Sequence, residues 1–171
     1  MSSIARVAIA ATLAALVATA PTRADDLRRT HVWIVSEPGG REPPKLGLQT
    51  RDPARRSMAF ERLFMTCRRA GGVEIVAWPV DLRMKDPEPG VLANFATDST
   101  AHPMANWRKS YNEMDEVTQV SVVSPDLAPV RDMLSAESVR YGVEGVSMAL
   151  PKASPAVRTF LAECARWSGR R

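Results

Sequence analysis

Apolar and polar residues alternate along most of the chain after its first 24 residues. Alternation over four to eight residues between turn residues is typical of half-buried β-strands. Gly71 and Gly72 separate two such runs and predict a hairpin, since glycine reaches the positive φ angles of tight turns. The pattern predicts strands over residues 32–36, 46–50, 63–69, 73–78, 91–97, 104–111, 117–123, 139–143 and 146–150.

Two segments carry apolar residues at helical spacing instead. Ser124 and Pro125 predict a helix start, because serine caps a first turn and proline fits the first helical position. Ser154 and Pro155 repeat this arrangement before a stripe that faces the core, formed by Val157, Phe160, Leu161 and Cys164. Together the elements predict a mainly β (α+β) fold, an antiparallel sheet or sandwich with two short helices.

Residues 1–24 are typical of a secretory signal peptide. A basic start containing Arg6 precedes the apolar run 7–18, and Thr22-Arg23-Ala24 offers small residues at the −3 and −1 positions of a cleavage site. The apolar run would span about 18 Å as a helix, against roughly 30 Å for a bilayer core. We therefore expect residues 25–171 to form one periplasmic or secreted β-rich domain without a membrane span.

Composition narrows the classes of partner. Hydrophobic residues make up 45% of the chain, which favours a packed core over disorder. The formal net charge is +4, and two of these charges belong to Arg6 and Arg23 in the segment expected to be removed. This balance is too weak to indicate nucleic-acid binding.

The chain has two cysteines, Cys67 and Cys164, which are 97 positions apart. Both lie on predicted apolar faces, one in a strand and one in the last helix. An even pair in an oxidising compartment predicts a structural disulfide. We expect this bond to join the C-terminal helix to the strand that carries Cys67.

No motif in the sequence predicts a catalytic residue, a cofactor or a metal site. His31 and His102 lack a second histidine or a carboxylate at metal-ligand spacing, so we expect solvated histidines at a strand edge or in a loop. The methionines after the signal segment are scattered, which favours core filling over a copper carrier: Met58, Met65, Met84, Met104, Met114, Met133 and Met148.

Two acidic groups keep a small periplasmic hydrolase open as an alternative, since paired carboxylates can cleave glycosidic bonds. A solvated surface is the preferred interpretation of both groups. One comprises Asp81, Asp86 and Glu88, and the other Glu113, Asp115 and Glu116. The leading interpretation is a binding protein, whose contact with an envelope protein or the cell wall would use Trp107, Arg108 and Tyr111, because aromatic residues and arginine dominate interface energetics. Burial of Trp107 in the core is an equally good interpretation of that residue.

The order of several landmarks resembles the small exported proteins associated with type VI secretion, the TagO-like (VasI-like) family. The landmarks are an early Trp33 strand, Lys45-Leu46-Gly47-Leu48, Leu63-Phe64-Met65-Thr66-Cys67-Arg68 with a Gly-Gly hairpin, Phe95, Trp107-Arg108-Lys109-Ser110, and Cys164-Ala165-Arg166-Trp167. The resemblance covers roughly residues 33–167. It implies a periplasmic, non-enzymatic accessory protein and transfers no catalytic residue.

Overall fold

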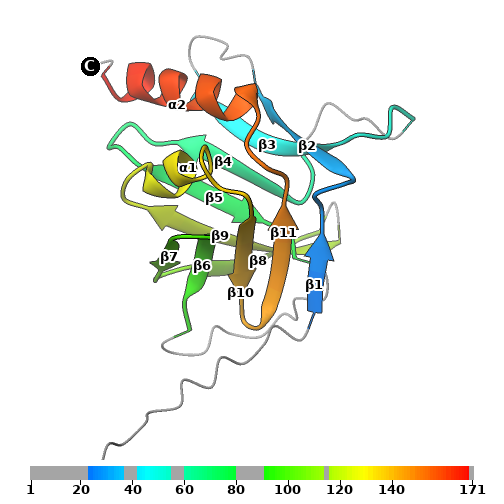
Figure 1. Ribbon diagram of the computed structural model, residues 1–171. Helices are drawn as coiled ribbons and strands as arrows, with labels where there is room; N and C mark the ends of the chain where they lie inside the picture. Colours follow the sequence, from blue (N-terminus) through cyan, green and yellow to red (C-terminus); the bar gives the residue numbers. More distant parts are fainter. Residues whose placement is uncertain (1–22, 37–41, 55–59, 80–90, 114–115, 170–171) are drawn as a thin grey trace, which may run out of the picture.

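Two β-sheets form the body of the protein (Figure 1). The computed structural model describes residues 23–36, 42–54, 60–79, 91–113 and 116–169. Sheet A has the order β1 (Arg23–Asp26), β11 (Val146–Leu150), β10 (Val139–Val143), β6 (Ala93–Thr97) and β7 (Ala101–Met104). Sheet B has the order β2 (His31–Val35), β3 (Lys45–Thr50), β4 (Leu63–Cys67), β5 (Val73–Ala77), β9 (Val117–Ser124) and β8 (Arg108–Asn112).

The predicted alternation is confirmed in the strands that build the core. In β4 and β5 every second residue is buried, and the buried sets are Leu63, Met65 and Cys67 in one strand and Val73, Ile75 and Ala77 in the other. Strand pairs β4–β5, β10–β11 and all others except β1–β11 run antiparallel. The mainly antiparallel β class with two helices is therefore correct.

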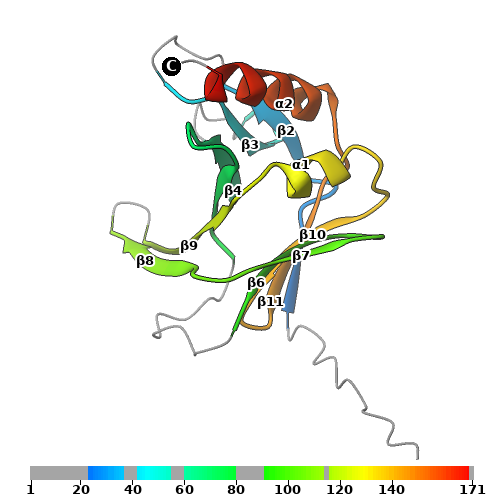
Figure 2. The ribbon, with the colours of Figure 1, turned by 90° about the vertical axis from the view of Figure 1, so that its left-hand side faces the viewer.

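Helix α2 (Pro155–Ser168) lies at one end of the molecule beside β2 and β3, with sheet A toward the other end (Figure 2). It buries Val157, Phe160 and Cys164 of the predicted stripe, together with Trp167. The Trp33 indole N–H donates a buried hydrogen bond to the Pro151 carbonyl at 2.9 Å. Strand β2 thereby holds the segment that leads into α2.

The start of the first helix was predicted too early. Ser124 is the last residue of β9 and pairs with Val73 of β5, so it is not free to cap a helix. Helix α1 (Ala128–Asp132) begins four residues later, with Pro129 in its first turn. Leu127 occupies the N-cap position and donates or accepts no side-chain capping bond. The Asp126 carboxylate, one residue before it, accepts the Ala128 N–H at 2.8 Å.

The predicted strand over residues 104–111 is two strands in different sheets. Strand β7 ends at Met104 in sheet A, and β8 starts at Arg108 in sheet B. Between them Asn106 has a φ of 59°, in the left-handed region and not in the extended region of a strand, so the chain turns there. Periodicity alone could not show this crossing, because the alternation continues on both sides of it.

Strand β1 was not predicted, because it falls where the signal segment ends. It pairs in parallel with β11, from Arg23 opposite Val146 to Asp26 opposite Ala149. The Asp25 carboxylate pairs with the Arg62 guanidinium of the segment that enters β4. A cut after Ala24 would leave Asp25 and its ion pair in the mature chain.

The Gly71–Gly72 turn gives a prediction with a built-in control. Both glycines have positive φ, at 88° and 77°, but a Cβ on Gly71 meets open space whereas a Cβ on Gly72 overlaps the Ser124 carbonyl. Gly71→Ala should cost about 1–2 kcal/mol of unfolding free energy, the cost of a left-handed residue. Gly72→Ala should cost a further ~1–3 kcal/mol through overpacking. Urea denaturation of both variants measures the difference, and equal losses would contradict the packing of β9 against this turn.

Candidate functional site

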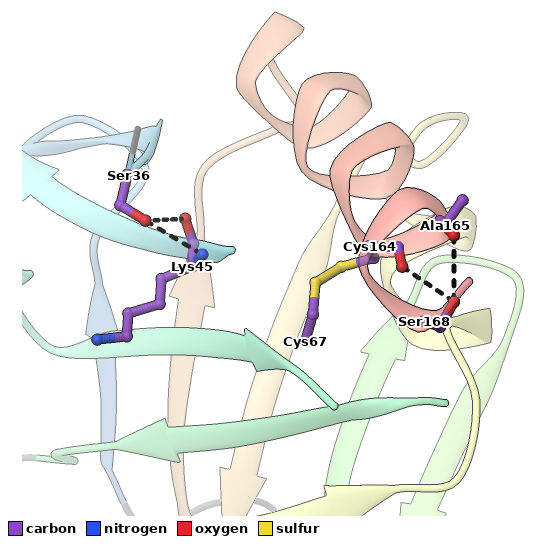
Figure 3. The surroundings of a disulfide bond; sticks show 6 residues. All are labelled: Ser36, Lys45, Cys67, Cys164, Ala165 and Ser168. Atoms are coloured by element: carbon purple, nitrogen blue, oxygen red, sulfur yellow. Dashed lines mark hydrogen bonds between the residues drawn. A yellow bond between two sulfur atoms is a disulfide. The ribbon is translucent and has the colours of Figure 1, made fainter. Parts of the chain in front are cut away.

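The predicted disulfide between Cys67 and Cys164 is confirmed. It joins the last residue of β4 to α2, with 5.5 Å between the two Cα atoms and both residues 3% exposed (Figure 3). The Ser168 hydroxyl donates to the carbonyls of Cys164 and Ala165 one turn below, at 3.1 and 3.2 Å. The cross-link thus holds α2 against the inner face of sheet B.

A cation–π contact supports the same docking. The Arg69 guanidinium, two residues after Cys67, lies 4.9 Å from the centre of the Trp167 ring. Trp167 is 7% exposed and belongs to the core. Contacts of this kind contribute roughly 0.5–1 kcal/mol where they remain accessible to water. The end of β4 and the last turn of α2 are therefore joined at two neighbouring points.

The structure divides the three residues predicted for partner contact. Trp107 is buried in the core, and its indole N–H donates to the Val91 carbonyl at 3.0 Å. Arg108 and Tyr111 are exposed on β8, an edge strand of sheet B. Since side chains alternate along a strand, Arg108 points to one face and Tyr111 to the other. The trio therefore does not form a single surface.

Lys109, which was not singled out from the sequence, fixes β8 to the rest of the protein. Its side chain is 3% exposed, and its ammonium lies 2.5 Å from a carboxylate oxygen of Glu144 in the turn between β10 and β11. The same ammonium stands 5.5 Å from the centre of the Trp107 ring. These contacts link sheet B to sheet A and place Tyr111 two residues beyond an anchored position. The pair spans 35 positions, so no local pattern could reveal it.

His31 is buried, so the expectation of a solvated histidine is wrong for it. Its Nδ1 lies 2.8 Å from the Thr30 hydroxyl, and its Nε2 lies 3.6 Å from the Glu61 carboxylate. Burial lowers the pKa of His31 below its ordinary value, and the attraction of Glu61 opposes this shift only in part.

His102 was expected in a solvated loop, but it lies on the edge strand β7 and its side chain has a partner. Its Nε2 lies 2.8 Å from the Asp132 carboxylate at the end of α1. Within the described residues, no group of three or more His, Cys, Asp or Glu side chains is arranged to hold a metal ion. The His102–Asp132 pair ties α1 to the edge of sheet A.

The other residues considered for chemistry lie in the core, on the surface or outside the described residues. Met65, Met104, Met133 and Met148 are buried in the core, in keeping with core filling. Glu113 and Glu116 are exposed where β8 leads into β9. The remaining residues of these groups lie outside the described residues: Met58, Asp81, Met84, Asp86, Glu88, Met114 and Asp115.

Comparisons of the chain with protein-family models, with curated proteins and with solved structures find no match. None of the helices in the described part of the chain is long and apolar enough to cross a membrane.

The disulfide gives the first prediction for this region. Cys164→Ser should lower the unfolding free energy by up to ~4–5 kcal/mol in the chain-entropy model, because it frees a loop of 97 positions in the unfolded chain. Ser168→Ala is the matched control, since it removes two hydrogen bonds from the same turn and should cost only ~0.5–1.5 kcal/mol. Thermal unfolding compares the two variants. Two free thiols in protein from an oxidising compartment, counted after denaturation, would refute the cross-link.

His31 gives a prediction on pH. Because its folded pKa lies below its unfolded value of about 6.5, the unfolded chain takes up the proton first as the pH falls. The contribution of neutral His31 to the free energy of unfolding is complete above the unfolded pKa and is lost as the pH falls toward the folded pKa. His31→Asn should therefore reduce the slope of unfolding free energy between about pH 7 and 5. Urea titrations across this range test it, and an unchanged slope would contradict the burial of a neutral ring.

Proposed function

We propose that the protein is exported to the envelope and acts there by binding a partner rather than by catalysis. The observation that carries the proposal is the buried Cys67–Cys164 disulfide. Such cross-links form and persist in oxidising compartments such as the periplasm, and they are rare in the cytosol. The signal-peptide pattern of residues 1–24 supports export independently.

The partner in this proposal is an envelope protein or a cell-wall component. The order of landmarks from Trp33 to Trp167, which resembles the TagO-like proteins, supports an accessory role in type VI secretion. Accessory proteins of this kind need a stable scaffold and an exposed contact, and do not need a reactive centre.

Tyr111 is the centre of the proposed partner contact. It is 49% exposed, on an edge strand whose preceding residues are fixed by Lys109 and the buried Trp107. A rigidly held, exposed tyrosine supplies a large contact area at a low entropic cost, which is typical of interface anchors. Arg108 belongs to the opposite face of β8 and does not contribute to this contact.

A photocrosslinking residue in place of Tyr111 tests the proposal in cells. The expected result is an adduct with another envelope component in the periplasmic fraction, on a chain that begins at Asp25. The same probe in place of Leu134, which is 39% exposed and remote in sequence, is the control and should give no such adduct. Protein that keeps Met1 and reduced thiols would contradict export. Equal adducts from both positions would contradict the contact at Tyr111.

A further inference from the structure

The outer face of sheet B, which points away from the core, is apolar at its centre. Open antiparallel sheets usually present polar side chains on the face that water reaches. Here the register places Ile34, Gly47, Phe64 and Val76 side by side across β2, β3, β4 and β5. Ile34, Phe64 and Val76 are each only partly buried, in contrast to the fully buried Met65 and Ile75 beside them.

Aromatic rings complete this surface. Phe60 lies directly over Gly47, so that a Cβ added to Gly47 would overlap its ring. The Phe60 and Phe64 rings stack with their centroids 5.9 Å apart, and the centroids of the Phe64 and Trp78 rings are 5.6 Å apart. We call the partly exposed residues Ile34, Phe60, Phe64, Val76 and Trp78 the outer patch. A contiguous apolar patch of this kind marks an interaction surface rather than a solvated one.

Two charges of opposite sign that have no partner among the described residues stand on the same face beside the outer patch. Lys45 lies on this face as well, and its ammonium is 3.8 Å from the Glu42 carboxylate. Arg108 of β8 pairs with Ser121 of β9, which pairs in turn with Val76 of β5. Arg108 therefore lies two strands, or about 10 Å, from Val76 on the same face. Glu74 lies two residues from Val76 along β5. In the described part of the chain neither Arg108 nor Glu74 has an ion pair or a side-chain hydrogen bond, whereas Lys109 next to Arg108 is paired with Glu144.

We propose that the outer patch binds a second copy of this chain in an isologous dimer. A two-fold axis that lies in this face can exchange the positions of Arg108 and Glu74, so each arginine meets the other copy's glutamate. The contact then forms twice per dimer around an apolar centre. One face with both an unpaired cation and an unpaired anion is complementary to itself, whereas an acidic or a basic foreign partner would satisfy only one of the two charges.

The dimer leaves the proposed partner contact free. Tyr111 alternates with Arg108 and Ser110 along β8 and points away from the outer patch. Each dimer would therefore present two exposed Tyr111 side chains, which raises the avidity for a partner with repeated binding sites. Self-association does not depend on export or on the identity of that partner, so its test stands apart from the crosslinking experiment.

Sedimentation velocity of the full, disulfide-bonded protein over a range of concentrations tests the proposal. The expected result is a reversible monomer–dimer equilibrium. Val76→Glu, at the centre of the outer patch, should weaken the dimer by about tenfold or more. Leu134→Glu makes the same change at an exposed apolar residue outside the patch and should leave the equilibrium unchanged. Circular dichroism and thiol counts confirm that both variants keep the fold.

Charge reversal distinguishes the proposed Arg108–Glu74 pairing between the two copies from non-specific hydrophobic association. Arg108→Glu or Glu74→Arg alone should weaken the dimer, because each brings like charges together at both contacts. The double variant should restore most of the affinity, since the pairs re-form with exchanged signs. A wild-type protein that is monomeric at every concentration would overturn the proposal. A dimer that resists Val76→Glu, or is not rescued in the double variant, would overturn it as well.

Discussion

The docking of α2 onto the inner face of sheet B is the constraint on which the rest of the structure depends. Sheet A packs against one part of this inner face. The helix α2 covers the remaining part, which β2, β3 and β4 form. The Cys67–Cys164 bond, the contact of Arg69 with Trp167 and the hydrogen bond from Trp33 to Pro151 all hold the helix there. Without this cover, the buried faces of three strands would meet water.

The strands were predictable wherever one face is buried and the turns are local. The hairpin around Gly71-Gly72 has positive φ angles at the predicted turn, and so does the turn at Glu144-Gly145 that separates the two predicted strands 139–143 and 146–150. The errors share a different cause, because each depends on pairing between distant residues. Ser124 is held by Val73, the break after Met104 follows from a change of sheet, and β1 exists only through its parallel pairing with β11. Local periodicity carries no information on such pairings.

The candidate surfaces were only partly predictable for the same reason. The disulfide followed from the apolar faces that carry its cysteines, whereas the sequence alone left open whether Tyr111 is exposed. The sequence could not decide between burial of Trp107 and a contact with a partner. It could not show that Lys109 reaches Glu144, because that ion pair joins β8 of sheet B to the β10–β11 turn of sheet A. A signal for the outer patch was present in Phe64, Val76 and Trp78, which interrupt the alternation where polar residues would be expected.

Hydrogen exchange measured by mass spectrometry, on oxidised and reduced protein at one pH, tests the central role of the docked helix most directly. Amides that open locally report the stability of their own element, whereas the most protected amides report global unfolding. Reduction of the disulfide should accelerate amide exchange in Pro155–Ser168 earlier, and by a larger factor, than it accelerates amide exchange in the β10–β11 hairpin. Equal acceleration in both elements, or none in α2, would contradict the claim that the cross-link holds this helix as the cover of the core.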